Sequence, residues 1–365
     1  MRSAGFIYPL IHMEHTTSVQ DPASDLNLRY VSGQESGYGR REEKGEFVYF
    51  SEKGPIKDTN VILRIQALVI PPAWQEVWIC KRKNGHIQAT GIDARGRKQY
   101  KYHREWSMRR NLKKFDRLIG FAQKLKQLRN QLAKDLRRRH LSKEKVCAIA
   151  VYTMSTTYIR AGNKTYEAEY GSFGLTTLKN RHIKIERNQV FFKFRGKKGV
   201  MQQVYLKEPK VAKMLKNVRE LPGQELFQYY DKDGHIQRLD SGDINAYLKQ
   251  AMEEDYTCKD FRTWAGCALA LLLLATEPFE ETETARKKTL LHVIDCVAER
   301  LGNTRTVTRN YYIHPELQRQ YVSGEMQSIL FKLKRKNELV LPGSATEKAL
   351  LQFLKMLNVS SGEAT

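Results

Sequence analysis

The chain has 365 residues, of which 41% are hydrophobic and 28% are charged, and its formal net charge is +23. This composition excludes a disordered chain, and the longest apolar run, Ala265–Ala275, is shorter than the roughly 20 residues of a membrane span. The positive surplus favours nucleic acid as partner, because each neutralised phosphate releases counterions; a basic enzyme for a small acidic substrate is the alternative.

The five cysteines are scattered and odd in number, and no two of them form a CxxC pair. Neither a disulfide framework nor a structural zinc site is therefore expected, and a reducing cytoplasm fits best. Residues 1–30 show little periodicity and predict an N-terminal extension. Its apolar patch, residues 6–11, is not followed by a small-residue cleavage site, which argues against secretion.

Residues 31–108 predict a small β-rich domain. Residues 47–50 and 77–80 are strand-like runs. The pair Asn84-Gly85 favours a type I′ hairpin turn, because both central residues of that turn need a positive φ. A short helix is expected over residues 58–68, ended by the two prolines that follow.

A long basic helix is expected at the start of the second domain, residues 109–365. Residues 101–140 contain 14 Lys and Arg against 3 Asp and Glu, and apolar residues recur at helical spacing from Leu112 to Leu136. A solvated helix face accounts for part of this charge. A helix of one sign repels itself, however, so phosphate contact is the better overall interpretation.

Most of the remaining chain predicts helices, at residues 143–161, 241–254, 258–275, 284–301, 305–322 and 345–358. Residues 182–185 and 190–194 instead alternate apolar and polar positions and predict a β-hairpin. The expected fold class is therefore α+β: a small β-rich N-terminal lobe and a mainly α-helical second domain that contains a β-hairpin.

Motifs for nucleotide and metal binding are missing from the sequence. It contains no GxxxxGK[ST] loop, no HExxH and no histidine cluster. Residues 231–234 begin like a calcium loop, but the twelfth position is Gly242 instead of Glu, so a turn is the better interpretation. No metal and no nucleotide cofactor is expected.

Metal-free transfer at a phosphodiester needs a nucleophile, cationic groups over the phosphate oxygens and an acid for the leaving alkoxide. Arginine suits the second role because its fork matches two oxygens. Lysine suits the third because burial among other cations lowers its pKa. A tyrosine nucleophile conserves the bond energy in a covalent phosphodiester, so resealing needs no ATP.

Six motifs follow one another along the chain: GRKQYKY at 96–102, YIRAGNK at 158–164, GLTTLKNRH at 174–182, FRGK at 194–197, KDFRTW at 259–264, and LGNT at 301–304 with the residues through Tyr312. Together they resemble the type IB DNA topoisomerases, in particular the compact poxvirus-like and bacterial branch. The resemblance spans about residues 28–325. It implies a β-rich DNA-binding lobe and a catalytic domain of the tyrosine recombinase and type IB topoisomerase kind.

The resemblance implies catalytic roles for five residues. The nucleophile is Tyr312, Arg160 and Arg262 contact the phosphate, and Lys197 is the general acid. Asn303 stands where the poxvirus pattern has histidine; its amide still donates a hydrogen bond but carries no charge.

Each assigned residue has a plainer alternative when taken alone. These are Tyr311 as the nucleophile, Lys198 as the acid, a surface or capping role at a helix end for Arg160, and a salt bridge with Asp260 for Arg262. The resemblance favours the second tyrosine, because the family places its tyrosine nine residues after the residue that follows the Leu-Gly pair, which is Tyr312 here.

The resemblance also implies DNA contacts. Basic and aromatic residues that alternate on a β-ribbon suit contact with a groove and with phosphates; a hairpin that only packs its own aromatic rings is the alternative. The expected contacts are Arg97, Gln99, Tyr100 and Tyr102 in the N-terminal lobe, and Lys164 and Tyr166 in the second domain.

The implied function is relaxation of supercoiled double-stranded DNA by a monomer that clamps the duplex, without ATP or metal, through a 3′-phosphotyrosyl intermediate. A cytoplasmic, nucleoid-associated location follows, with no membrane partner. Two alternatives remain. A tyrosine recombinase shares the helical fold and the Arg-Lys-Arg-Tyr order but carries histidine where this chain has Lys259. A non-catalytic architectural DNA-binding protein would not need the complete catalytic set.

Overall fold

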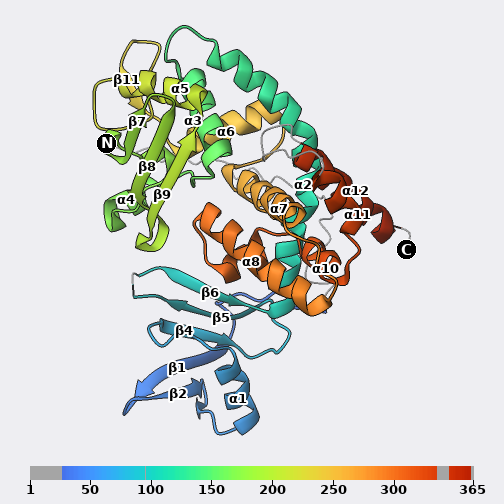
Figure 1. The fold of residues 1–365 in the computed structure, drawn as a ribbon. Coiled ribbons are helices and arrows are strands. Elements are labelled where there is room, and N and C mark those ends of the chain that lie inside the picture. The colour runs from blue at the N-terminus through green and yellow to red at the C-terminus, as the bar shows by residue number, and fades with distance from the viewer. Residues whose placement is uncertain (1–26, 95, 335–344, 363–365) are drawn as a thin grey trace, which may run out of the picture. The chain divides into compact units, whose positions relative to one another are not determined.

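The computed structural model describes residues 27–94, 96–334 and 345–362, so most of the predicted N-terminal extension lies outside the described residues. The chain forms two compact units that divide between Leu112 and Lys113 (Figure 1). The division falls inside one helix, α2 (Arg104–Leu136). The β-rich first unit and the mainly helical second unit confirm the expected fold class.

The N-terminal unit is built on one antiparallel sheet with the strand order β3-β2-β1-β4-β5-β6. Helix α1 (Thr59–Ala67) confirms the predicted helix; the carboxylate of Asp58 caps it by accepting from the Asn60 amide at 2.9 Å. The buried side chains of Ile65, Val77 and Ile79 form the small core between helix and sheet. The strands are β1 (Gly37–Glu43), β2 (Glu46–Ser51), β3 (Gly54–Pro55), β4 (Gln75–Cys80), β5 (Ile87–Ile92) and β6 (Lys98–Tyr102).

The predicted type I′ turn at Asn84-Gly85 is wrong. Neither residue has a positive φ, and β4 and β5 are joined by the longer segment 81–86. The reason is a competing partner: Arg29 donates its amide to the Asn84 carbonyl at 2.8 Å and so draws the segment into a bridge. The tight turn of this sheet lies instead at Lys44-Gly45, between β1 and β2, where φ is 53° and 85°.

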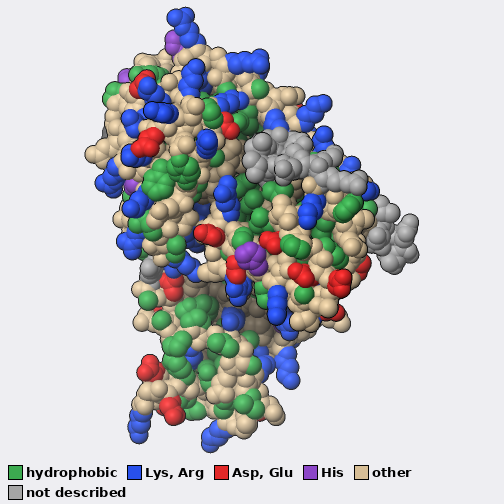
Figure 2. All heavy atoms as spheres, in the orientation of Figure 1, with side chains coloured by type: hydrophobic (Ala, Val, Ile, Leu, Met, Phe, Trp, Pro, Cys, Tyr) green, Lys and Arg blue, Asp and Glu red, His purple; other side chains and the backbone are tan. Residues whose placement is uncertain are grey.

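Helix α2 confirms the long basic helix. Its predicted apolar stripe includes Phe115, Leu118, Leu125 and Leu128, which are all buried in the core of the C-terminal unit. Its cations occupy the other positions. In Figure 2, Lys and Arg side chains are spread over the visible face rather than gathered in one patch, so on this face charge alone does not locate a DNA-contacting surface.

The C-terminal unit is organised around α7 (Cys258–Thr276), which packs against α8, α11 and α12 (Figure 1). The predicted apolar run lies on this helix and is buried by these neighbours. None of the helices that the structure describes is long and apolar enough to cross a membrane. The other helices are α3 (Lys143–Thr157), α4 (Lys164–Tyr170), α5 (Pro209–Arg219), α6 (Ser241–Met252), α8 (Glu283–Leu301), α9 (Arg305–Tyr311), α10 (Pro315–Ser323), α11 (Gln327–Lys334) and α12 (Ala345–Gly362).

One predicted helix is split. The sequence favoured a single helix over residues 305–322, whereas α9 ends at Tyr311 and α10 begins at Pro315. Proline has no amide hydrogen to donate, and its ring disfavours the helical conformation in the residue before it. Accordingly, His314 is extended, with φ −55° and ψ 131°. The break places Tyr312 outside both helices.

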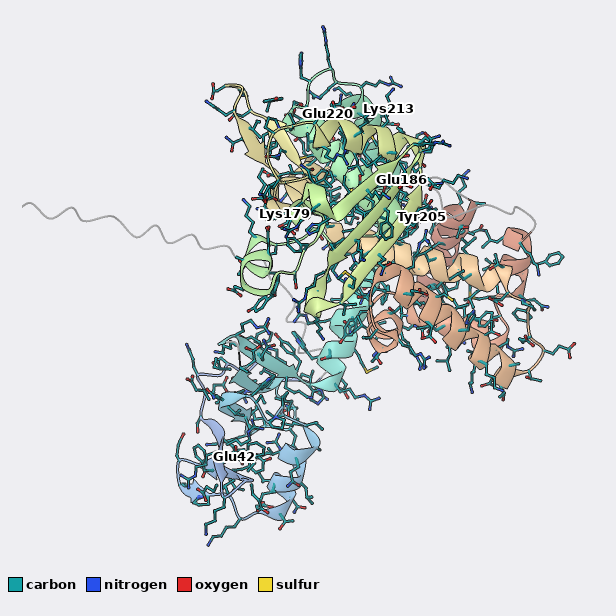
Figure 3. The ribbon with its side chains drawn as sticks, turned by 60° about the vertical axis from the view of Figure 1, so that its left-hand side comes forward. Glu42, Lys179, Glu186, Tyr205, Lys213 and Glu220 are labelled. Atoms are coloured by element: carbon teal, nitrogen blue, oxygen red, sulfur yellow. The ribbon has the colours of Figure 1, made fainter. Side chains whose placement is uncertain are left out.

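The predicted β-hairpin is part of a three-stranded antiparallel sheet, β7 (Ile183–Glu186), β8 (Gln189–Arg195) and β9 (Met201–Lys207). The sequence missed β9, whose outward positions carry exposed side chains such as Tyr205, labelled in Figure 3. A second small hairpin joins β10 (Gln228–Tyr230) to β11 (Ile236–Arg238). Its turn contains Asp231, whose carboxylate accepts from the His235 amide at 2.8 Å, and it confirms the interpretation of residues 231–234 as a turn.

Candidate active site

Arg160 lies in an extended segment and does not end a helix, contrary to expectation. Helix α3 stops at Thr157, and Tyr158 closes it in the left-handed conformation with φ 58°. The carbonyl of Arg160 accepts from the Leu175 amide at 2.7 Å, and the carbonyl of Ala161 accepts from the Thr176 amide at 2.7 Å. The backbone that carries the arginine is therefore fixed by a neighbouring segment.

Two glycines allow that neighbouring segment to come so close. A Cβ placed on Gly174 would lie 2.5 Å from the Cα of Gly162 and 2.7 Å from the Arg160 carbonyl oxygen. Gly162 also has φ +97°, which side-chain-bearing residues rarely adopt. The close approach explains two of the glycines in the motifs of the sequence.

Arg262 lies one turn into α7, and its side chain is buried, with 5% of its surface exposed. It donates to the carbonyls of Tyr158 and Leu301, the latter at 2.6 Å. The alternative salt bridge with Asp260 is not formed, because that carboxylate accepts from the amide and hydroxyl of Thr257 at 2.8 and 2.9 Å. Burial, together with the charge of Arg160, lowers the pKa of Arg262 to about 10, so the guanidinium stays protonated at neutral pH.

Arg160 and Asn303 meet at the end of α8. The Arg160 guanidinium donates to the Gly302 carbonyl at 3.0 Å and to the side-chain oxygen of Asn303. Burial lowers the pKa of Arg160 as well. The oxygen of the Asn303 amide is thus engaged by Arg160, which leaves its nitrogen as a donor.

The site contains two buried donors without a partner among the described residues: Nε of Arg262 and Nδ2 of Asn303. Buried polar groups are nearly always hydrogen-bonded, so unpaired donors in a folded protein call for an explanation. Here one donor belongs to the Arg262 guanidinium group itself, and the other belongs to Asn303, which contacts the guanidinium group of Arg160. An anion bound between them would satisfy both donors and offset the charge repulsion.

Tyr312 lies beside Arg262, one of these two arginines. The Cζ atom of Arg262 is 5.5 Å from the centre of the Tyr312 ring, and Tyr312 packs against the core. The neighbouring Tyr311 is 43% exposed, and its ring lies under the ammonium group of Lys114 at 4.8 Å. The two adjacent tyrosines therefore have different surroundings, and only the second contacts a candidate catalytic arginine.

Lys197 and Lys198 follow β8 in a short turn. Lys197 is exposed, and it lines a small cavity of about 20 Å³ together with Arg160 and Arg262. Lys198 has φ 63° and is not among the residues that line this cavity. The structure thus brings Lys197, rather than its neighbour, to the two arginines.

Sequence reasoning missed Gly266, which lies one turn after Arg262 on α7. A Cβ at this position would lie 2.4 Å from the carbonyl oxygen of Tyr312 and 2.9 Å from its Cβ. The thiol of Cys267 donates to the same carbonyl at 3.4 Å. Only a residue without a side chain lets the segment after α9 lie against α7. A helix-interior glycine two residues after the KDFRTW motif was the signal that could have found it.

We expect Gly266→Ala to slow strand cleavage by about 10- to 100-fold, because a displacement of about 1 Å at a reacting group can cost ~10²-fold. The overpacked methyl group is also expected to destabilise the fold by about 1–3 kcal/mol. Single-turnover cleavage measured well below the melting temperature separates the two effects. An unchanged cleavage rate would show that the close approach to Tyr312 has no part in the chemistry.

Lys114 is a second residue that the sequence did not single out. Its ammonium group donates to the Tyr311 carbonyl at 2.6 Å, next to the candidate nucleophile. Burial, together with the charge of Lys259, lowers its pKa to about 8. Its position among 63 Lys and Arg residues gives no sequence signal.

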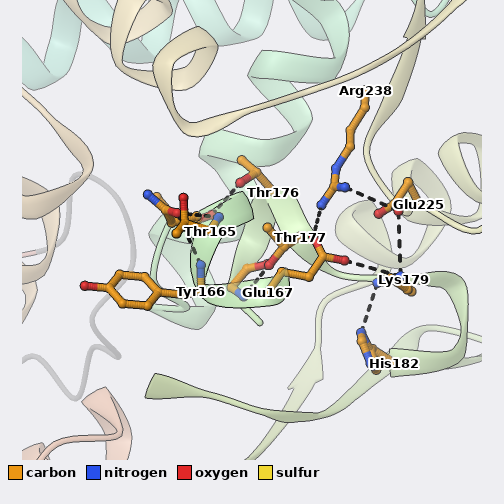
Figure 4. Close-up of polar contacts among 12 residues, drawn as sticks. Thr165, Tyr166, Glu167, Thr176, Thr177, Lys179, His182, Glu225 and Arg238 are labelled. Carbon is orange, nitrogen blue, oxygen red and sulfur yellow. Dashed lines mark hydrogen bonds and ion pairs between the residues drawn. The ribbon is translucent and has the colours of Figure 1, made fainter. Parts of the chain in front are cut away.

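The candidate contacts Lys164 and Tyr166 lie on the short helix α4, and both are exposed. An ion-pair network holds this helix from behind (Figure 4). Arg238 contacts Glu167 and, at 3.4 Å, Glu225. Lys179 contacts the same two carboxylates at 3.3 and 3.9 Å. The four side chains are between 13% and 24% exposed, so these partly buried ion pairs tie α4, through Glu167, to the neighbouring segments.

The four candidate contacts of the N-terminal unit lie on or beside β6. Arg97 forms an ion pair with Asp93 at 2.7 Å, and Gln99 donates to the same carboxylate at 2.9 Å. The rings of Tyr100 and Tyr102 stack with their centres 5.9 Å apart. Tyr100 is 44% exposed, so the aromatic pair packs on itself and still presents a ring to solvent.

Comparison with known families gives two matches that follow one another along the chain. Residues 98–337 match a family model described as eukaryotic DNA topoisomerase I, catalytic core. Residues 46–93 match a model described as bacterial DNA topoisomerase IB, N-terminal domain. The two matches correspond to the helical and the β-rich parts of the chain.

Individual proteins are similar over most of their length. DNA topoisomerase 1B of Acanthamoeba polyphaga mimivirus is 30% identical over 282 residues, which are 75% of this chain and 84% of that protein. DNA topoisomerase 1B of Vaccinia virus (strain Copenhagen) is 24% identical over 268 residues, 71% of this chain and 82% of that protein. Among solved structures, the XerH site-specific recombinase in a post-cleavage complex aligns with a TM-score of 0.35 and 15% identity, over 56% of this chain and 51% of that one.

Proposed function

The chain belongs to the type IB DNA topoisomerases, and on that premise we propose that it relaxes supercoiled duplex DNA by cutting and resealing one strand. The observation that carries this proposal is a pair of arginine side chains, the half-buried Arg160 and the buried Arg262, that line one cavity beside Tyr312. Nε of Arg262 and Nδ2 of the adjoining Asn303 are buried donors without a partner among the described residues. Such a cluster suits a phosphodiester whose negative charge increases in the transition state.

In the proposed reaction, Oη of Tyr312 attacks the phosphorus atom and loses its proton to solvent or a nearby base. The bond between phosphorus and the 5′-oxygen breaks, leaving a 3′-phosphotyrosyl link. Lys197 gives a proton to the departing 5′-oxygen, which becomes a hydroxyl group. The broken end swivels about the intact strand. The 5′-hydroxyl then attacks the same phosphorus atom, restores the bond between phosphorus and the 5′-oxygen, and releases Tyr312. The phosphotyrosyl link conserves the bond energy, so no nucleotide is consumed.

Arg160, Arg262 and Asn303 are proposed to hold the non-bridging oxygens. The two guanidinium groups supply positive charge, and the Arg262 Nε and Asn303 Nδ2 donors have no partner among the described residues, so they would bind an anion without breaking an internal hydrogen bond. Donors that are already oriented cost no reorganisation during the reaction. Asn303 performs the donor part of the role that histidine has in the poxvirus pattern.

We further propose that the enzyme acts as a monomer on a duplex, in the cytoplasm among the nucleoid. Lys164 and Tyr166 would contact the backbone near the cut. Arg97, Gln99, Tyr100 and Tyr102 would contact it from the N-terminal unit, with Arg97 and Gln99 exchanging their Asp93 partner for phosphate. The two alternatives predict different products. A recombinase would join strands of two duplexes, whereas the proposed enzyme reseals the strand that it cut, and an architectural protein would bind DNA without cutting it.

Purified protein is expected to relax both negatively and positively supercoiled plasmid in the presence of EDTA and without any nucleotide. Swivelling about an intact strand has no preferred direction, and the proposed chemistry uses only side chains. Gel electrophoresis of the topoisomers over time measures the rate. A strict requirement for magnesium or ATP would remove the proposed mechanism, and binding without relaxation would favour the architectural alternative.

A further inference from the structure

Helix α12 lies beyond residue 337, where the match to the catalytic-core family model ends, yet its first turn reaches the back of the candidate active site. Glu347 is the residue that makes the contact. Its carboxylate accepts from the Arg129 guanidinium at 3.0 and 2.7 Å and from the indole Nε1 of Trp264 at 3.1 Å. One carboxylate therefore joins three helices, α2, α7 and α12.

The contact is made at the same turn of α7 that carries Arg262. Residues two apart on a helix project to roughly opposite sides, since each residue turns the helix by about 100°. Arg262 is accordingly directed to Tyr312 and the phosphate-binding donors, whereas Trp264 is directed to α12. This turn of α7 is held between the site on one side and Glu347 on the other.

The surroundings of Glu347 show that the contact is not a loose surface pair. Its side chain is 13% exposed and Trp264 is 5% exposed. Glu347, Arg262 and Tyr158 together line a cavity of about 40 Å³. Tyr158 in turn provides a carbonyl to Arg262.

We propose that Glu347 is a positioning residue of the cleavage reaction, and that α12 acts as a latch that fixes the turn of α7 from which Arg262 reaches the phosphate. The inference rests on the proposed function. The partners of Glu347 are Arg129, which neutralises the carboxylate, and Trp264, which transmits the position of the carboxylate to α7. The C-terminal helix is in this sense part of the catalytic unit.

The test compares single-turnover cleavage of a short duplex by Glu347→Ala, Glu347→Gln and Trp264→Phe with that by wild type. Lys348→Ala is the matched control, since Lys348 is an exposed neighbour on the same helix turn. Glu347→Ala is expected to cleave about 10-fold more slowly, because a displacement of a catalytic group by up to about 1 Å can lower the rate by up to ~10²-fold. Glu347→Gln keeps the size and removes the charge, and Trp264→Phe keeps an aromatic ring but removes the indole N–H and part of the volume, so smaller decreases in the same direction are expected. Affinity for an uncleavable duplex stays within about twofold in all four variants.

The same substitution in an Arg262→Ala background distinguishes positioning from general destabilisation. If Glu347 acts through Arg262, adding Glu347→Ala to Arg262→Ala causes no further slowing. Equal slowing in both backgrounds, or a wild-type cleavage rate for the folded single variants, overturns the inference. If Glu347→Ala does not fold, Glu347→Gln and Trp264→Phe decide. Absence of cleavage by wild type instead refutes the proposed function, and the inference with it.

Discussion

Replacement of Tyr312 by phenylalanine is expected to abolish the covalent protein–DNA adduct, whereas Tyr311→Phe is expected to retain it. Phenylalanine keeps the ring that packs against the core and beneath Arg262 but lacks the oxygen that attacks phosphorus. Tyr311 is exposed beside Lys114 and has no such contact. Labelled duplex carried with the protein on a denaturing gel measures the adduct directly.

Tyr311→Phe is the matched control, since the two variants differ only in which of two adjacent hydroxyl groups is lost. The adduct peptide obtained after nuclease digestion identifies the attached residue independently. Attachment at Tyr311 would move the nucleophile by one position. Attachment to the 5′ side of the break would contradict the proposed chemistry itself, because the 3′-phosphotyrosyl link defines which strand end swivels.

Lys197→Ala is expected to slow cleavage of normal DNA by about 10²- to 10⁴-fold, the usual contribution of a general acid. On a substrate with sulfur in place of the 5′-bridging oxygen, it is expected to cleave at nearly the wild-type rate. A thiolate leaves without needing a proton, so the acid becomes dispensable. Arg262→Ala acts on the non-bridging oxygens and is expected to stay about 10²- to 10³-fold slow on both substrates.

Lys198→Ala is the matched control for Lys197→Ala. Lys198 belongs to the same exposed turn but does not line the cavity with Arg160 and Arg262. Its loss is expected to change neither substrate's cleavage rate by more than about twofold, as for a surface cation. Rescue of Lys198→Ala by sulfur, or failure to rescue Lys197→Ala, would reassign the acid.

The sequence predicted the elements whose signals are local. Helix α1 is ended by prolines and capped by Asp58, and α7 is a long apolar run, so both are correct. The break before Pro315 was equally local but was outweighed by an apparent period over residues 305–322. The turn at Asn84-Gly85 failed for another reason: its outcome depends on Arg29, which is more than 50 residues away and gives no signal near the turn.

The candidate catalytic residues were found through motifs, and physical reasoning from the chain alone would not have found them. Lys197 is one cation among 63 Lys and Arg, and its role becomes visible only when β8 brings it to Arg160 and Arg262. Gly266 and Glu347 depend on contacts with segments 46 and 83 residues away, at Tyr312 and Trp264. Such pairings follow from tertiary packing, which no local pattern encodes.

The contact between Gly162 and Gly174 has a consequence for how this enzyme can evolve. The two residues close a loop whose base is fixed by backbone atoms and whose far side carries α4 with Lys164 and Tyr166. Under the proposed function, residues in the loop can therefore change, and alter the DNA contacts proposed for α4, without moving Arg160 at its base. The two glycines themselves have no such freedom, because an added carbon at either one pushes directly on the backbone of the other or of the arginine. The proposed DNA contacts and the backbone that holds Arg160 are thus separated within a stretch of about a dozen residues.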